Sequence, residues 1–213
     1  MIRKILQFAL LLIAIQSTMA LATGLEALEN FIKSTRSGKA DFTQVVTSPA
    51  REGQVPRSKT SSGSFEFQRP GHFRFVYRKP FEQTIVADGQ TLWLYDVDLN
   101  QVTARKQAQA LGTTPIALIA TAPDLKALQA DFVLQNAPDK DGLQWVNGAP
   151  KAADSQVIGI RVGFKGDTLV ALEILDGFGQ RSALQFIGLQ VNPPFAPNHF
   201  QFRPPAGADV IRP

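Results

Sequence analysis

Hydrophobic and polar residues alternate regularly along the stretch from Gly63 to Arg105. One parity is aromatic and the other is mostly polar or charged; the aromatic set is Phe65, Phe67, Phe73, Phe75 and Tyr77. Because successive side chains of a strand point to opposite faces of a sheet, this pattern predicts strands that share one aromatic face. Pro70-Gly71 separates the first two strands, and Asp88-Gly89 fits a two-residue hairpin loop further along.

Arg69 is the exception in this pattern, because it places a cation at the end of the apolar parity. An inward-facing guanidinium needs a partner, since an unpaired buried charge is very costly. One candidate is the C-terminal end of a short helix starting at Pro115, where the carbonyl groups around Ala120–Ala122 lack partners within the helix. The alternative is a surface salt bridge with Glu66 or Glu82. Arg69 is therefore the first candidate functional residue.

Helical patterns occur in two other regions. Thr23 and Glu26 form a capping box ahead of apolar residues at helical spacing, which predicts a helix over Leu25–Arg36. Thr114-Pro115 predicts the start of a short apolar helix, and Asp124 predicts the cap of a second one. Core packing is the simplest role for the apolar side of each helix.

Strand patterns fill most of the remaining chain, over Ala40–Thr47, Phe132–Asn136, Leu143–Val146, Val157–Phe164, Thr168–Leu175 and Ala183–Leu189. The polar stretch Ser48–Ser62 contains prolines and a glycine, and it predicts a long loop or an irregular edge. Pro193–Pro205 is rich in proline and offers phenylalanines that can plug one end of a sheet.

Many antiparallel strands with helices in only two places predict a mainly β, α+β fold. We expect an incomplete antiparallel β-barrel, that is, a strongly curved sheet, with a helical lid over an apolar cavity on its concave face. The alternative for the aromatic face is the core of an ordinary β-sandwich.

Residues 1–22 have the features of a signal peptide. Arg3 and Lys4 precede an apolar run, and Ala20-Leu21-Ala22 matches a cleavage site, so we expect cleavage after Ala22 and export. An uncleaved membrane anchor is the alternative, but the apolar run is short for a membrane span. Residues 23–213 are then expected to form a single domain.

Composition excludes several functions. The chain has no cysteine, which rules out disulfides and thiol chemistry. The formal net charge of +4 falls to +2 when Arg3 and Lys4 leave with the signal, and no basic run favours nucleic-acid binding. The stretch Asp96–Asn100 begins like a calcium loop but lacks its glycine, and His72 and His199 have no metal-ligand spacing. We therefore expect no enzyme activity, no cofactor and no metal.

The sequence resembles the LolA family, periplasmic carriers of outer-membrane lipoproteins. The resemblance extends over essentially the whole mature chain and rests on Arg69-Pro70, Phe73, Ile85–Gly89, Leu92–Tyr95, Gln101–Thr103, Pro115–Ile119 and Phe200–Pro205. Phe75 departs from the commonest form of the family, in which we expect tryptophan.

The resemblance implies a carrier of acylated lipoproteins, loaded by an inner-membrane LolCDE-type ABC transporter and unloaded to the outer-membrane receptor LolB. It implies that Arg69 is the lid latch and that Phe73, expected near the rim, contacts the transporter. The implied acyl-chain cavity is lined by Phe65, Phe67, Phe73, Phe75, Tyr77, Trp93, Ile116, Leu118 and Ile119. A monomer is expected.

Two other kinds of protein share parts of this pattern. LolB has the same fold but is anchored through an acylated cysteine, which this chain lacks, so this chain is expected to shuttle. A periplasmic sensor that binds other proteins through a similar open sheet is the alternative function. A lipid-modifying enzyme is disfavoured because no nucleophile–base set is evident.

Overall fold

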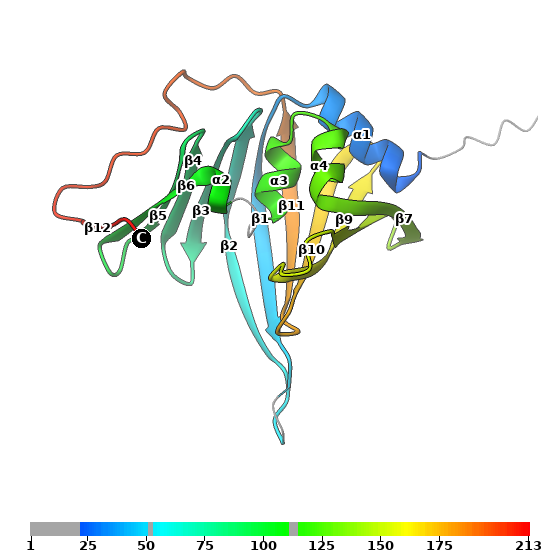
Figure 1. The fold of residues 1–213 in the computed structure, drawn as a ribbon, viewed down its shortest axis with the longest axis horizontal. Helices are drawn as coiled ribbons and strands as arrows, with labels where there is room; N and C mark the ends of the chain where they lie inside the picture. The colour runs from blue at the N-terminus through cyan, green and yellow to red at the C-terminus, as the bar shows by residue number, and fades with distance from the viewer. Residues whose placement is uncertain (1–21, 51–52, 111–114) are drawn as a thin grey trace, which may run out of the picture.

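The computed structural model describes residues 22–50, 53–110 and 115–213. These residues form one 12-stranded sheet in the order β12-β6-β5-β4-β3-β2-β1-β11-β10-β9-β8-β7. All neighbouring strands are antiparallel except β12 and β6. The sheet is strongly curved and does not close, because β12 and β7 lie at its two free edges (Figure 1). The predicted α+β class and incomplete barrel are confirmed.

Most elements are joined by short connections, and the long segment Asn192–Ala208 joins β11 to β12. The strands are β1 (Ser37–Ser48), β2 (Arg57–Gln68), β3 (His72–Lys79), β4 (Gln83–Asp88), β5 (Thr91–Asp96), β6 (Gln101–Lys106), β7 (Phe132–Lys140), β8 (Leu143–Pro150), β9 (Val157–Lys165), β10 (Thr168–Asp176), β11 (Arg181–Val191) and β12 (Asp209–Ile211). The helices are α1 (Gly24–Ser34), α2 (Gln107–Ala110), α3 (Pro115–Thr121) and α4 (Leu125–Asp131).

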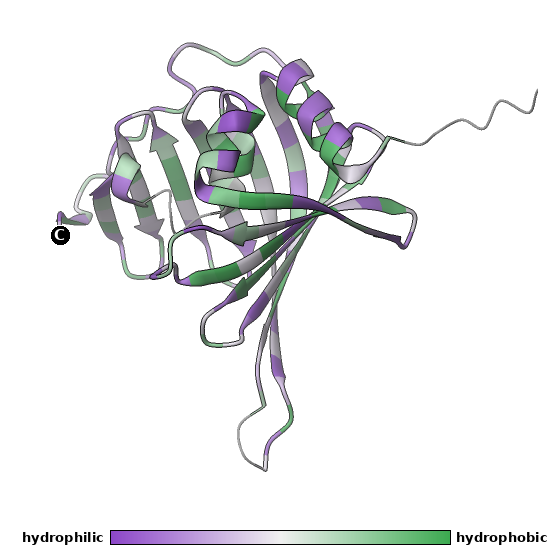
Figure 2. Cartoon of the chain, turned by 45° about the vertical axis from the view of Figure 1, so that its right-hand side comes forward, coloured by the Kyte–Doolittle hydropathy of each residue, from purple (hydrophilic) through white to green (hydrophobic). Residues whose placement is uncertain are grey.

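The aromatic parity of the sequence becomes the concave face of the sheet. Strand register places Phe67 beside Phe73 and Phe65 beside Phe75, and β4 and β5 continue these two rows. Helices α1, α3 and α4 lie over this face (Figure 1). Hydrophobic residues gather on the side of the helices that faces the strands, and hydrophilic residues lie on the outer side of α1 (Figure 2). The core therefore lies between the helices and the concave face.

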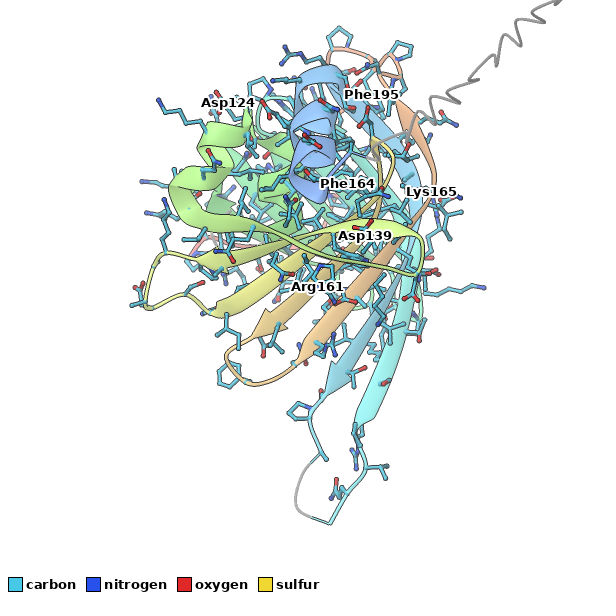
Figure 3. All side chains as sticks on the ribbon, turned by 90° about the vertical axis from the view of Figure 1, so that its right-hand side faces the viewer. Asp124, Asp139, Arg161, Phe164, Lys165 and Phe195 are labelled. Carbon is cyan, nitrogen blue, oxygen red and sulfur yellow. The ribbon has the colours of Figure 1, made fainter. Side chains whose placement is uncertain are left out.

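Helix α1 begins with the predicted capping box. Glu26 N donates to Thr23 Oγ1, and Thr23 N donates to the Glu26 carboxylate. The helix ends at Ser34, two residues earlier than predicted, where the N–H of Thr35 donates to Phe31 O. Its buried side packs on β7–β10, and Phe164 of β9 lies behind α1 (Figure 3). None of the helices described combines the length and apolar character that a bilayer span requires.

The stretch Ser48–Ser62 forms the outer part of a long β1–β2 hairpin. The predicted long loop is confirmed only between Ser48 and Arg57, because Arg57–Ser62 belongs to β2. Arg57 pairs with Ser48, and the ladder between the two strands continues without a break to Ser37. The hairpin projects beyond the rest of the sheet (Figure 1). Both of its faces meet water there, so its strands carry polar residues on both parities and lack the alternation that marks a half-buried strand.

The C-terminal segment from Asn192 to Ala208 lies on the convex face instead of plugging an end of the sheet. Phe202 packs on Trp93 and Tyr95, with ring centroids 5.5 and 6.2 Å away. The segment then reaches β12, which pairs in parallel with β6 (Figure 1). One half of the sheet is thus covered on both faces.

Candidate functional site

Arg69 follows β2 at the end of the aromatic face and connects three parts of the fold. Its Nε donates to Thr35 O, at the end of α1, over 2.8 Å. Its Nη1 donates to Ile119 O over 3.0 Å and to Ala122 O over 2.6 Å. These two carbonyl groups belong to the C-terminal end of α3, which has no further turn to satisfy them. This contact was one of the two candidates that the sequence left open, and the structure shows it.

The alternative partner for Arg69, a surface carboxylate, is wrong. Among the described residues, Arg69 makes no ion pair, while Glu66 lies on the convex face beside Lys39 and His199. Arg69 is only 8% exposed. The guanidinium also lies 5.5 Å from the centre of the Phe31 ring and 5.4 Å from that of Phe67, within the range of cation–π attraction.

Burial makes the Arg69 position electrostatically costly. Desolvation, with a smaller contribution from repulsion by Arg36, lowers the pKa of Arg69 to about 10. Arg69 is still charged at neutral pH, because this value lies well above 7. Its Nη2 is buried and has no hydrogen-bond partner among the residues that the structure describes. Three carbonyl groups therefore accept hydrogen bonds from the buried guanidinium, but they do not use all of its N–H groups.

The aromatic face next to Arg69 is closed. Phe65, Phe67, Phe73 and Phe75 are each 2% exposed or less, and Ile119 of α3 is 1% exposed. Edge-to-face and stacked ring contacts link them, for example Phe65 with Phe75 at 4.3 Å. Acyl chains can enter this space only if the helices move, so the open cavity stays a prediction for a loaded state. Ile116 and Leu118 lie in α3, but their side chains are outside the described part of the structure.

Two residues of the predicted site lie elsewhere than expected. Phe73 is 0% exposed, so its predicted place at an accessible rim is wrong; its predicted contact with a transporter is not tested by this geometry. Trp93 points to the convex face, where Nε1 donates to Asp88 Oδ2 over 2.8 Å and the ring meets Phe202. Its assignment to the cavity is therefore wrong. The motif at Leu92–Tyr95 is apolar on both parities because both faces are covered here.

Asp88 organises the turn before Trp93. Its carboxylate accepts hydrogen bonds from the N–H groups of Gln90 and Thr91 as well as from the indole. Burial alone would raise the pKa of Asp88, but these bonds and nearby His72 hold that pKa below its ordinary value. The loop between β4 and β5 is Gly89-Gln90, one residue later than predicted.

Sequence reasoning missed a row of polar side chains on the concave face. At the end away from Arg69, each of five strands replaces its aromatic or aliphatic residue by a polar one: Gln83, Tyr77, Ser61, Gln44 and Ser182, which we call the polar belt. Tyr77 Oη donates to Gln44 Oε1 over 3.1 Å, and Gln44 Nε2 donates to Ser182 Oγ over 2.6 Å. Burial raises the pKa of Tyr77 to about 12. The sequence did carry a signal for the belt, because the inward parity changes from Phe42 to Gln44 on β1 and from Phe75 to Tyr77 on β3.

The two histidines also come together, although their sequence spacing gave no reason to expect it. His199 Nε2 lies 2.7 Å from Glu66 Oε2, and His72 Nδ1 lies 2.8 Å from Pro70 O. Both imidazole rings contact Phe200. They fasten the C-terminal segment to the convex face. The described residues contain no group of three or more histidine or carboxylate side chains suited to a metal ion, and Asp96 accepts a turn hydrogen bond from Leu99 N.

The sheet is open and curved, and helices that Arg69 contacts cover its aromatic face. These features are those of a protein that holds an apolar interior between a sheet and its helices. The model of the family "outer membrane lipoprotein carrier protein LolA" matches residues 33–203. The chain is 64% identical over 209 residues to the outer-membrane lipoprotein carrier protein of Albidiferax ferrireducens, covering 96% of this chain and 98% of the relative. It is 49% identical to that of Methylibium petroleiphilum over 89% of this chain and 90% of the relative. The chain belongs to the LolA family.

Among solved structures, a LolA superfamily protein from Nitrosomonas europaea is similar to this chain. The two sequences are 11% identical, the match covers 85% of this chain and 98% of that one, and the TM-score is 0.45.

Proposed function

We propose that this chain is a periplasmic carrier that encloses the acyl chains of lipoproteins between its concave face and α1 and α3. Membership of the LolA family supports the carrier role, and the relatives named above carry the same description. The signal peptide ending at Ala22 delivers the chain to the periplasm. The mature chain acts as a monomer.

The observation that supports this proposal best is how the aromatic face is covered. Helix α3 has only seven residues, and helices this short are not stable alone in water. Its position depends on packing against the sheet and on the two carbonyl contacts with Arg69. A helix held in this way can be displaced without breaking the backbone hydrogen bonds of the sheet.

Loading and unloading of acyl chains then require α3 to move away from the aromatic face and to return. An ABC transporter of the LolCDE type hands over the acylated protein while the Arg69 contacts are open, and LolB receives it. Phe73 becomes accessible to the transporter only in that open state, because the closed state buries it completely. The chain has no cysteine that could be acylated, so it moves between the two membranes instead of being held at one.

Mass spectrometry of material that co-purifies with the periplasmic protein tests this function. We expect peptides that carry an acylated N-terminal cysteine to co-purify, and detergent to release them. A matched sample of Phe75→Asp, which places a carboxylate within the aromatic face, is expected to lose them. Co-purification of only unlipidated peptides would support the sensor alternative and overturn the carrier proposal.

A further inference from the structure

The concave face changes abruptly from apolar to polar along its strands. On β3, Phe73 and Phe75 are followed by Tyr77, and on β1, Phe42 is followed by Gln44. The same change occurs on β4 and β11, where Ile85 gives way to Gln83 and Leu184 to Ser182. The polar belt crosses the strands obliquely. Gln83 pairs with Tyr77, Gln44 pairs with Ser61 on β2 and with Leu184 on β11, and Ser182 lies one inward-facing position further, opposite Val46.

A hollow begins at the belt and opens to solvent. It measures about 500 Å³ and is lined by the belt residues Gln44, Ser61, Tyr77 and Gln83, with Lys59 and Phe81 among the residues at its rim. This volume lies in the range of sites for small organic groups. Tyr77 belongs to both regions, because its ring packs edge-on against Phe42 at 5.0 Å while its hydroxyl faces the belt.

The hydrogen bonds within the belt point in one direction and end in a free donor. Tyr77 Oη donates to the Gln44 amide, and that amide donates to Ser182 Oγ. Because the Ser182 oxygen accepts this bond, its own proton can be given to a further acceptor. The second N–H of the Gln44 amide is also available, because the described contacts use only one of its two.

We propose that the polar belt binds the ester carbonyl groups of the diacylglyceryl moiety on acylated cargo, with Ser182 and Gln44 as the donors. This inference rests on the proposed carrier function. A diacylglyceryl group joins apolar chains to carbonyl oxygens that only accept hydrogen bonds, and the concave face offers an apolar surface followed by donors in the same order. Acyl chains directed toward Arg69 place their esters at the belt and the attached polypeptide in the solvent-open hollow.

A pair of synthetic lipopeptides tests the proposal directly. One has a cysteine carrying a dipalmitoyl glyceryl diester, and the other has the corresponding dihexadecyl diether, which lacks the carbonyl oxygens. Both are titrated against the purified mature chain by displacement of a fluorescent fatty acid. We expect the diester to bind about three- to tenfold more tightly, the contribution of one or two neutral hydrogen bonds. Without such bonds the diester has no advantage, because burying its carbonyl groups is unfavourable.

Variants identify the donors. Ser182→Ala and Gln44→Leu are each expected to bring the diester-to-diether ratio close to one. Thr43→Val, on the convex side of β1, is the matched control and keeps the ratio. If the belt only stabilises the sheet, Ser182→Ala lowers the melting temperature and leaves the ratio unaltered, which overturns the proposal.

The wild-type comparison keeps the test informative if a variant does not fold. Equal binding of the two lipopeptides by the wild-type chain refutes the belt assignment while the carrier function stands. Binding of neither lipopeptide refutes the carrier function itself, and the belt assignment with it.

Discussion

Replacing Arg69 by leucine tests whether this residue holds the cover closed. The substitution removes the hydrogen bonds to Thr35 O, Ile119 O and Ala122 O and places an apolar side chain beside Phe31 and Phe67. The sheet itself keeps its ladder, because Arg69 follows the end of β2. We therefore expect a folded protein in which α3 is released more easily.

The size of the effect follows from two opposing contributions. The two bonds to the end of α3 are charge-assisted, and such bonds contribute about 1.5–3 kcal/mol each. Burial lowers the Arg69 pKa from 12.5 to about 10, which is a penalty of roughly 3 kcal/mol for the charged form. The net preference for the closed state is thus on the order of 0–3 kcal/mol, which corresponds at most to a bias of about a hundredfold.

The assay follows a fluorescent lipopeptide from the carrier to purified LolB. A weaker closed state raises the share of the open, loaded state, so Arg69→Leu should bind cargo at least as tightly as wild type and deliver it up to about a hundredfold less completely at equilibrium. Arg36→Leu is the matched control, because it removes an exposed neighbouring cation that has no hydrogen bond to α3. Efficient delivery by a well-folded Arg69→Leu protein would falsify the latch.

Three further predictions concern other parts of the fold. Phe73→Glu puts a carboxylate at a position with no exposure, so we expect a loss of about 4 kcal/mol or more and a melting temperature roughly 10 °C lower; an unchanged melting curve would show that the concave face is already open. Phe202→Ala removes the ring that packs on Trp93 and should cost about 1–3 kcal/mol without altering lipopeptide affinity, whereas a loss of affinity would place the cargo on the convex face. In an alkaline absorbance titration, the phenol that ionises at about pH 12 should vanish in Tyr77→Phe. Since this pKa is raised from 10.0, wild-type stability should also fall between pH 10 and 12.

Local patterns in the sequence made the contact between Arg69 and α3 one of two candidates. The parity of β2 put a cation on the apolar face, and the short helix after Pro115 has C-terminal carbonyl groups without partners. The two features fit together, because a buried guanidinium needs hydrogen-bond acceptors and the carbonyl groups at a helix end need donors. The parity of Phe65 to Tyr77 gave the concave face for the same reason, since one face of the sheet had to be buried.

Contacts between distant parts of the chain were not predictable in this way. Trp93 looked like a cavity residue because nothing in its own strand indicates that the C-terminal segment covers the convex face. Gln44 and Ser182 are 138 positions apart, so their hydrogen bond depends on the register between β1 and β11, which the local sequence does not specify. The long hairpin was missed because two solvated faces leave no alternation to read.

The closed aromatic face explains how a carrier can release a ligand that is so apolar. Each buried CH₂ of an acyl chain contributes about 0.8 kcal/mol, so three long chains in a ready-made cavity would exceed the roughly 20 kcal/mol at which non-covalent affinities saturate. In this structure the side chains of Phe31, Leu28 and Ile119 are buried in the same apolar core as the aromatic face. Each of these side chains is worth about 1.5–3 kcal/mol when buried, and cargo must displace part of that packing. Under the proposed mechanism, binding exchanges one apolar contact for another, and the return of the helices reverses the exchange when the cargo leaves.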